Sequence, residues 1–339
     1  MPVSVTASSR AERRGSLLTR LVAILIGPRI GFVLKLGVSA GLIALVCRDI
    51  DVGAFAASLR TQSLAWLAAT VLLGLVQIGL LSLRWHMILR ALGANSGLVS
   101  ALAVTFMGCF FGAFMFGPTG GDVARAVLAP PRSLGRRGIV HSVLFERFAS
   151  TVGLGLAAGP VVMFGAATLA RGIPLFVAVA TVPLPFLAMA AIGYLARRFA
   201  EREGALVQAL RELDESLRRL CRCWPRFAIA VAIAALGQFL VAVEAWCLAQ
   251  SQHLGVSLLD FAILMPPVML LVALPISAGG WGVRERAMVA ALGLVGIGAA
   301  PALLLSVELG LIGTLVSLPG GAIWSVRCFS RDASFKSVV

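Results

Sequence analysis

Long apolar runs separated by short polar stretches limit how this chain can fold more than any other feature of its sequence. Most of the runs approach the ~20 residues that an α-helix needs to cross about 30 Å of hydrocarbon, although 258–274 and 287–299 are short. Their length and lack of strict alternation fit helices rather than the strands of a barrel. The sequence therefore predicts an all-α, multi-pass membrane protein. The runs occupy residues 30–46, 64–83, 98–116, 139–165, 173–196, 227–250, 258–274, 287–299 and 301–325.

Composition and charge exclude several other classes of protein. Of the 339 residues, 59% are hydrophobic and 13% are charged, which leaves too few polar side chains for a soluble enzyme, a disordered chain or a nucleic-acid module. The net charge of +14 comes mainly from Arg in the stretches between apolar runs. We interpret these stretches as cytoplasmic loops that also contact anionic lipid headgroups. No nucleic-acid partner is expected.

The cysteines and the short motifs give no sign of a metal site, a cofactor or an enzyme. The six Cys are scattered, and Cys221 and Cys223 form a C-x-C with no second pair. A zinc site would need four ligands at finger-like spacing. The sequence also contains no Ser-His-Asp set, P-loop or nucleotide fingerprint. We therefore expect no metal, no cofactor and no catalytic residues.

Polar stretches divide the chain into membrane halves and basic segments. Residues 1–29 form a basic N-terminal segment and 327–339 a tail, and both are expected in the cytoplasm. The two membrane halves, 30–196 and 227–326, are joined by a linker at 197–226. Leucines recur through this linker at spacings of 4, 3, 4 and 3, which predicts an amphipathic basic helix on the membrane or against the bundle. They are Leu206, Leu210, Leu213, Leu217 and Leu220.

The charge rule produces a conflict around the run at 98–116. The loops on either side, 84–97 and 117–138, are both basic and both favour the cytoplasm. Either the run enters and returns as a re-entrant hairpin, or one loop breaks the rule. Gly108 and Gly112 lie near the middle of the run, where a chain could reverse, and favour the hairpin. Irregular backbone at this depth survives only where it is buried in protein or lines a wet cavity.

Two segments in opposite halves of the chain look alike. They are G-P-T-G-G-D-V-A-R at 117–125 and P-I-S-A-G-G-W-G-V-R-E at 275–285. In each, a Pro comes shortly before a Gly-Gly pair, and an Arg follows four residues after the second Gly. Such paired interrupted segments are typical of a transporter site built from an internal repeat, of which an inverted repeat is one form. The residues concerned are Gly120, Gly121 and Arg125 in the first segment and Gly279, Gly280 and Arg284 in the second.

The residue types in these segments suit an anion. A Gly-Gly pair adopts backbone conformations closed to other residues, and a Pro ends helical pairing. A helix that starts after the glycines aims free N–H groups at a negative charge. An Arg adds a planar fork that grips phosphate in two hydrogen bonds. Each segment by itself fits a tight helical hairpin without a ligand equally well.

Charged residues in or beside apolar runs are the remaining candidates for the site. A charge at the bilayer centre costs at least about 2.5–3.5 kcal/mol, so such residues usually pair or line a functional cavity. We add Asp122, Glu146, Arg147 and Glu285 to the substrate-binding set, with Trp281 as a cavity-lining residue. Because neighbours on a helix do not face each other, Glu146 and Arg147 are expected to have different partners.

Two acidic residues, Glu244 and Glu308, lie within apolar runs and have no local cation. In one interpretation each forms an ion pair with a residue of another helix and so fixes the packing of the helices, with Arg125 or Arg284 as the partner of one of them. The other makes them a proton relay, or a counter-charge for a cationic headgroup. We keep both interpretations for these residues.

Four segments taken together resemble the flippase-type transmembrane domain of lysylphosphatidylglycerol synthases, in the same order and over residues from about 30 to 325. The resemblance implies a bacterial or archaeal plasma-membrane protein, with Asp122, Arg125, Glu146, Arg147, Arg284 and Glu285 as its central polar residues. The synthases continue into a soluble transferase domain, whereas this sequence stops at Val339, so aminoacyl transfer is not expected of it. The segments are L-R-W-H-M-I-L-R-A-L-G (83–93), G-P-T-G-G-D-V-A-R (117–125), S-V-L-F-E-R-F (142–148) and P-I-S-A-G-G-W-G-V-R-E (275–285).

The hypothesis that combines these observations is a lipid translocase. Re-entrant segments would form a polar cavity in the bilayer, and the two arginines would hold the phosphate of a lipid headgroup there. The expected partners are therefore a lipid with an anionic phosphate headgroup and the bilayer itself, and a homo-oligomer is left open. The alternatives are an ion-coupled transporter of a soluble anion and a membrane-embedded lipid-carrier transferase.

Overall fold

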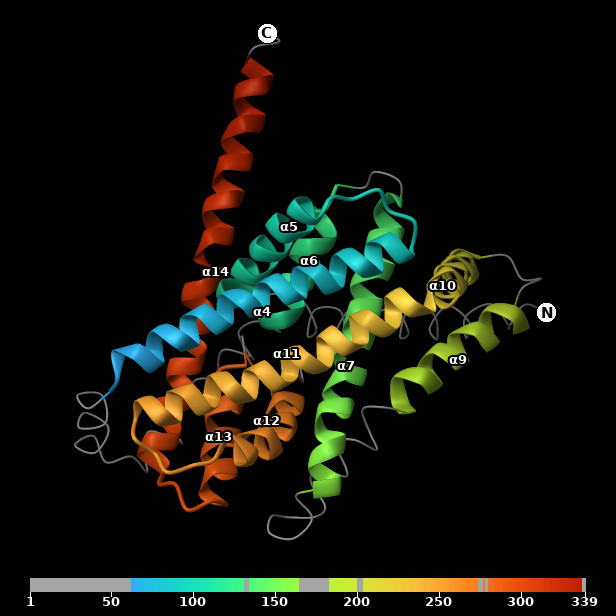
Figure 1. Cartoon of the computed structure of the whole chain (residues 1–339). Helices are drawn as coiled ribbons and strands as arrows, with labels where there is room; N and C mark the ends of the chain where they lie inside the picture. Colours follow the sequence, from blue (N-terminus) through green and yellow to red (C-terminus); the bar gives the residue numbers. More distant parts are fainter. Residues whose placement is uncertain are drawn as a thin grey trace, which may run out of the picture.

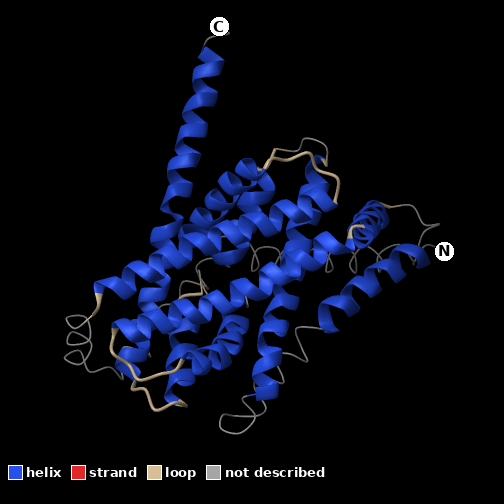
Figure 2. Ribbon diagram, in the orientation of Figure 1, coloured by secondary structure: helices blue, strands red, loops and turns tan. Residues whose placement is uncertain are grey.

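In the computed structural model, every regular element of the described residues is a helix and none is a strand (Figure 2). The all-α class predicted from the apolar runs is confirmed. The N-terminal segment and the first run, 30–46, lie outside the described residues. The structure describes residues 62–130, 134–164, 183–199, 204–273, Ser277 and 280–336.

The first half contains a long helix, two short helices joined by a π-helical turn, and a second long helix. They are α4 (Leu64–Ala91), α5 (Leu98–Phe111), η1 (Gly112–Phe116), α6 (Gly117–Leu128) and α7 (Gly135–Phe164). α5 and α6 pack against each other, and Ala101 near the start of α5 joins one apolar cluster with Ala129, just after α6. The two short helices therefore form an antiparallel hairpin, which we call the first hairpin.

The second half repeats this order of long, short, short and long helices. They are α11 (Trp224–Ser251), α12 (Leu258–Ala273), α13 (Val283–Gly293) and α14 (Ala299–Lys336). α12 and α13 pack together, and Phe261 near the start of α12 shares a buried cluster with Leu292 near the end of α13. These two helices form the second hairpin.

Helix length separates the two kinds of element. α4, α11, most of α7 and residues Ala299–Arg327 of α14 are long and apolar enough to cross a membrane. The hairpin helices have 14, 12, 16 and 11 residues. At about 1.5 Å per residue they reach about 17–24 Å, which falls short of the hydrocarbon core. The chain is thus a multi-pass membrane protein, and partial insertion of the hairpins stays a prediction.

The first helices of the two halves, α4 and α11, lie side by side and run in opposite directions (Figure 1). The backbone N–H of Ser63, just before α4, donates to the carbonyl of Ser251 at the end of α11, at 3.1 Å. Each hairpin follows its long helix in the chain. The first hairpin therefore starts and finishes at the end of the bundle where α4 ends, and the second starts and finishes at the opposite end. An inverted repeat would have this arrangement, and the repeat itself stays a prediction.

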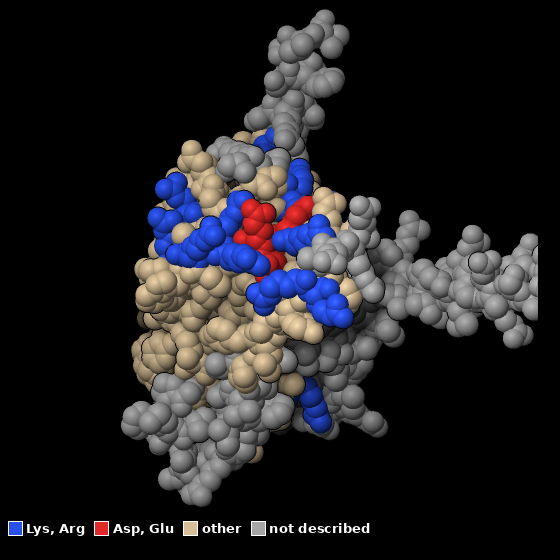
Figure 3. Space-filling model, turned by 90° about the vertical axis from the view of Figure 1, so that its right-hand side faces the viewer, with Lys and Arg blue, Asp and Glu red and all other residues tan. Residues whose placement is uncertain are grey.

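Charge distinguishes the two ends of the bundle. At the end where α4 finishes and α11 begins, exposed arginines surround a few acidic residues (Figure 3). We call it the basic end, and its arginines include Arg90, Arg136, Arg137, Arg218, Arg219, Arg222 and Arg226. The described residues at the opposite end, 62–66, 251–260 and 292–300, contain no Lys or Arg. The positive-inside rule therefore predicts a cytoplasmic basic end.

The linker between the halves contains a helix that packs on the bundle. α10 (Ala205–Arg222) turns Leu213, Leu217 and Leu220 toward an apolar cluster formed with α4, α7 and α11. The sequence predicted an amphipathic helix either on the membrane or against the bundle. The apolar face of α10 packs against the bundle. A further helix, α9 (Pro183–Arg198), overlaps the second part of the run expected at 173–196 and ends two residues beyond it.

The reversal in the first hairpin agrees with one of the two glycines expected there. α5 continues through Gly108, whereas Gly112 is the first residue of η1, where the chain turns. Gly108 serves packing, because a Cβ there would meet the Arg125 side chain and the carbonyl oxygen of Gly121. The basic stretch expected as a loop at 117–138 therefore contains α6, the returning helix of the hairpin.

The apolar run at 287–299 does not form a span of its own. α13 ends at Gly293, and a turn precedes the start of α14 at Ala299. Gly296 in this turn has φ of +80°, a conformation that favours glycine and interrupts the helix. The apolar residues of this run are divided between the second hairpin and α14.

Candidate functional site

Three helices of the first half bring five charged side chains into one network. Glu146 on α7 lies between two arginines: Arg84 of α4 contacts one carboxylate oxygen, and Arg125 of α6 donates to the other at 2.9 Å. Asp122, one turn before Arg125, accepts from Arg125 and from Arg147 of α7. Glu146 is 2% exposed and Arg125 4% exposed, so the network forms inside the bundle. As expected, the neighbours Glu146 and Arg147 have different partners.

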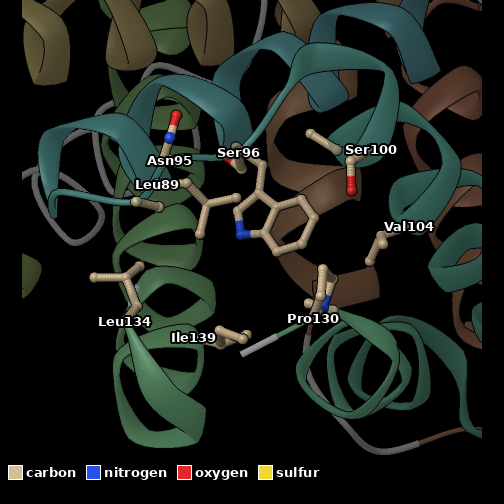
Figure 4. A pocket seen from close by; sticks show the side chains of 12 residues that line it. Leu89, Asn95, Ser96, Ser100, Val104, Pro130, Leu134 and Ile139 are labelled. Atoms are coloured by element: carbon tan, nitrogen blue, oxygen red, sulfur yellow. The ribbon is translucent and has the colours of Figure 1, made fainter. Parts of the chain in front are cut away.

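Trp85 separates this network from a small pocket toward the basic end. Its indole N–H donates to the Ser142 hydroxyl at 3.1 Å, and the Arg125 guanidinium carbon lies 5.6 Å from its ring centroid. The small pocket has a volume of about 30 Å³, with Leu89, Ser100 and Pro130 among its lining residues (Figure 4). A space of this size suits a water molecule rather than a substrate.

The tip of the second hairpin has fewer polar contacts than the first. Gly280 and Gly282 have φ of +83° and +86°, which only glycine adopts readily, and they turn the chain into α13. The Glu285 carboxylate accepts from the N–H of Gly282 and pairs with Arg284 Nη2 at 2.8 Å. Ser306 of α14 lies within 3.4 Å of both the Arg284 and the Glu285 side chains.

Two further contacts hold the Arg284 side chain in place. Its guanidinium carbon lies 4.7 Å from the ring centroid of Trp281, within the range of a cation–π interaction. On the other side it packs against Gly310 of α14, where a Cβ would overlap the guanidinium group. Arg284 therefore occupies a slot that exists because residue 310 has no side chain.

The tips of the two hairpins meet at one cavity of about 320 Å³, which we call the central cavity. It receives Arg125 from the first hairpin and Arg284 from the second, so the two similar segments of the sequence lie together in space. Gly120 is buried beside it, and Gly279 lies outside the described residues. The lining residues are Leu81, Gly108, Cys109, Gly112, Ala113, Gly121, Asp122, Arg125, Arg147, Trp281, Arg284, Leu309, Gly310, Gly313 and Thr314.

The charges around the central cavity do not cancel. Its walls and the contacts behind them contain the four arginines Arg84, Arg125, Arg147 and Arg284, and the three carboxylates Asp122, Glu146 and Glu285. Among the described side chains around the cavity, arginines therefore outnumber carboxylates by one. In addition, Arg125 Nη1 is buried and has no hydrogen-bond partner among the described residues. A buried donor in this state is costly.

The two isolated glutamates lie outside this network. The expectation that Arg125 or Arg284 neutralises one of them is wrong, because those arginines pair with Asp122, Glu146 and Glu285. Asp122 lies one helical turn before Arg125 and Glu285 is next to Arg284 in sequence, whereas Glu146 reaches Arg125 from another helix. Glu244 is buried in α11, with Oε1 lacking a hydrogen-bond partner in the described part. Glu308 accepts from amide side chains.

Arg84 is the member of the network that sequence reasoning missed. It follows the apolar run 64–83 directly, and it reads as an interfacial residue beside Trp85. The structure continues α4 to Ala91, which carries Arg84 inside the bundle. The apolar residues Ile88 and Leu92, at helical spacing from Arg84, were the available signal that the helix continues.

Metal coordination has no support in the described residues. Among them, no group of three or more His, Cys, Asp or Glu side chains is placed to hold an ion. The central cavity presents guanidinium groups and glycine backbone, a donor set that suits anions rather than cations.

Fold and site together define a class: an all-helical, multi-pass membrane protein in which two helical hairpins meet at an arginine-lined cavity. Sequence comparison then places it in a family. The chain belongs to the family described as the lysylphosphatidylglycerol synthase TM region, whose model matches residues 32–321. The match covers both halves and both hairpins, and confirms the resemblance found in the four sequence segments. No curated protein matches the chain.

Proposed function

We propose that this protein is a lipid translocase that moves a lipid with a phosphate-containing headgroup between the leaflets of the membrane. The observation that carries the proposal is a cavity that receives one arginine from each hairpin and has an excess of one positive charge among the described side chains around it. A headgroup phosphate between Arg125 and Arg284 would neutralise that charge and accept charge-assisted hydrogen bonds. Membership of a family described by a lipid synthase supports a function connected with membrane lipid.

The arrangement of the hairpins suits passage between two sides. The first hairpin starts and finishes at the basic end and the second at the opposite end, while the tips of both lie at the cavity. Small movements of one hairpin against the other would expose the cavity to alternate sides, the usual principle of transporters with paired broken helices. The acyl chains would stay in the bilayer, in contact with the exposed apolar faces of the long helices.

A leaflet-accessibility assay in proteoliposomes tests the proposal, with a fluorescent phospholipid reduced from the outside. We expect the double substitution Arg125→Ala/Arg284→Ala to abolish translocation. Because Arg125 supports a buried network, the single substitution Arg284→Ala is measured in parallel, and it should also lose most of the activity. Arg219→Ala, which removes an exposed arginine at the basic end, is the matched control. Unchanged lipid movement in both cavity variants would overturn the mechanism.

The same proteoliposomes separate the other candidate functions. Uptake of a soluble phosphate-containing anion without lipid movement would favour an ion-coupled transporter. Formation of a modified lipid from an added donor would favour a membrane-embedded transferase.

A further inference from the structure

A second polar cluster lies at the opposite end of the bundle from the basic end. Glu308 of α14 accepts hydrogen bonds from two amide side chains, one on each of its carboxylate oxygens. One amide belongs to Gln62, just before α4, and the other to Gln252, just after α11, at 2.9 Å. The carboxylate therefore connects three long helices at the end where α4 starts and α11 finishes. We call these three residues the amide cluster.

This carboxylate is buried, and its bonded partners are neutral. Glu308 is 8% exposed, and no Lys or Arg of the described residues forms an ion pair with it. Two amides satisfy its oxygens, but no cation of the described residues pairs with its negative charge in this buried position, where charge is costly. Glu146, by contrast, lies between two arginines.

The charged and titratable groups on the surrounding elements are engaged elsewhere or stand apart. On α13, Arg284 and Glu285 pair with each other. Asp260 at the start of α12 accepts from a nearby serine hydroxyl at 2.7 Å. His253, in the loop after α11, is exposed, and Glu244 lies within α11. Gln62, just before α4, contributes an amide, and the charged and titratable residues of α4, Arg84, His86 and Arg90, lie in its last turns, far from the cluster.

The amide cluster can hold either protonation state of the carboxyl group. In the observed arrangement both amides donate, which suits the ionised form. Gln252 is 7% exposed, and its Oε1 is buried with no hydrogen-bond partner among the described residues. That oxygen is an acceptor available to a protonated Glu308, after a rotation of the amide. A fixed structural ion pair would have no such second arrangement.

α14 connects the amide cluster to the central cavity over one helical turn. Glu308 lies between Ser306, which contacts Arg284 and Glu285, and Gly310, against which the Arg284 guanidinium packs. Leu309, the next residue along, lines the cavity. A shift of α14 that follows a change at Glu308 would therefore move the slot that holds Arg284.

From this geometry we propose that Glu308, with Gln62 and Gln252, is a proton-binding site that couples a proton gradient to the central cavity. Protonation from the opposite end would rearrange the contacts that hold α4 and α11 to α14. Through Ser306 and Gly310, that rearrangement would change the position of Arg284. The coupling part of this inference rests on the proposed translocase function, whereas proton binding at Glu308 does not.

Two measurements on the full chain test the two parts separately. Infrared difference spectra of the purified protein in nanodiscs, recorded over a pH titration, should contain a protonated-carboxyl band that Glu308→Gln removes. In proteoliposomes, a pH gradient should stimulate lipid movement by the wild type, and Glu308→Gln should lose that stimulation while keeping gradient-independent movement. Asp260→Asn, which removes another acid at the same end, should behave as the wild type in both assays.

A second variant covers the case in which Glu308→Gln does not fold. Gln252→Met removes both amide functions at similar length, and it should shift the midpoint of the carboxyl titration without removing the band. An unchanged band in Glu308→Gln, an equal gradient response in that variant, or stimulation by a sodium gradient instead would each overturn the proton site. A titrating band at Glu308 in a protein that moves no lipid would overturn the translocase proposal alone.

Discussion

The tips of the two hairpins come from similar sequence segments but are held in different ways. At the first tip, Arg125 belongs to a network that extends over α4, α6 and α7. At the second, Arg284 pairs with the residue next to it in sequence and rests against one aromatic ring. The first tip is therefore fixed by long-range ion pairs, whereas the second depends on local contacts and on α14. We infer that the second tip is the part that moves during transport.

The largest difference between the tips should appear in stability when their buried acids lose charge. Glu146→Gln leaves two buried arginines without their shared carboxylate, which should cost about 3–5 kcal/mol in the free energy of unfolding. Glu285→Gln leaves one arginine and keeps an acceptor for the Gly282 N–H, so about 1.5–3 kcal/mol is expected. Denaturant unfolding in one detergent, followed by tryptophan fluorescence, measures both.

Glu215→Gln is the control, because its carboxylate is exposed and pairs with Arg219 one turn away. Such exposed pairs contribute about 0.3–0.5 kcal/mol. Equal losses for Glu146→Gln and Glu285→Gln would mean that the first tip is held no more firmly than the second.

The next difference concerns two glycines that face the two arginines. In Gly108→Ala the new methyl group meets the Arg125 side chain and the backbone oxygen of Gly121, so the helices of the first hairpin must separate. We expect losses of both thermal stability and transport. In Gly310→Ala the methyl group displaces the end of the Arg284 side chain only. Transport should fall more than tenfold there, while thermal stability changes less than in Gly108→Ala.

Gly79→Ala provides the comparison for both variants, because a Cβ at this position of α4 meets nothing within 4 Å. It should fold and transport normally. A Gly310→Ala protein with full transport activity would show that the slot for Arg284 is not needed.

How far the sequence predicts this architecture depends on the kind of feature. Length and apolarity of the runs predict α4, α11 and the helical class, because a helix in lipid satisfies its own backbone. The family resemblance in four segments was confirmed by the match over residues 32–321. The run at 287–299 was misjudged, because hydropathy does not detect a turn at glycine when the residues around it are apolar.

The structure brings several of the predicted site residues together, whereas the sequence did not predict how they pair. The repeated Gly-Gly spacing indicated that Arg125 and Arg284 belong together, and the structure places both at one cavity. Which acid meets which arginine depends on the distance and rotation between helices, and periodicity within one helix carries no such information. For this reason Arg84 was missed, and the amides around Glu308 could not be foreseen.

Substituting lysine for each arginine tests the difference between the two hairpin tips. Arg125→Lys keeps the charge but replaces a fork that reaches two carboxylates with a single ammonium group. A hydrogen bond to a charged group contributes about 1.5–3 kcal/mol, so we expect the loss of one to lower the transport rate at least tenfold. Arg284→Lys breaks contacts with one carboxylate and one ring, so a smaller loss is expected. Initial rates in proteoliposomes measure both, and a larger loss in Arg284→Lys would reverse the assignment of the fixed and moving tips.

The smallest effect should come from the ring beside Arg284. Trp281→Phe keeps an aromatic face but weakens the cation–π contact, and a loss of about 0.5–1 kcal/mol corresponds to a two- to fivefold rise in the apparent KM for the lipid. Trp224→Phe is the matched control, because Trp224 is exposed at the start of α11, and no described residue of α11 lines the cavity. If Trp281 orients Arg284 toward the headgroup, the maximal rate should change less than KM. A fall in the maximal rate alone would instead give Trp281 a part in the movement of the second tip.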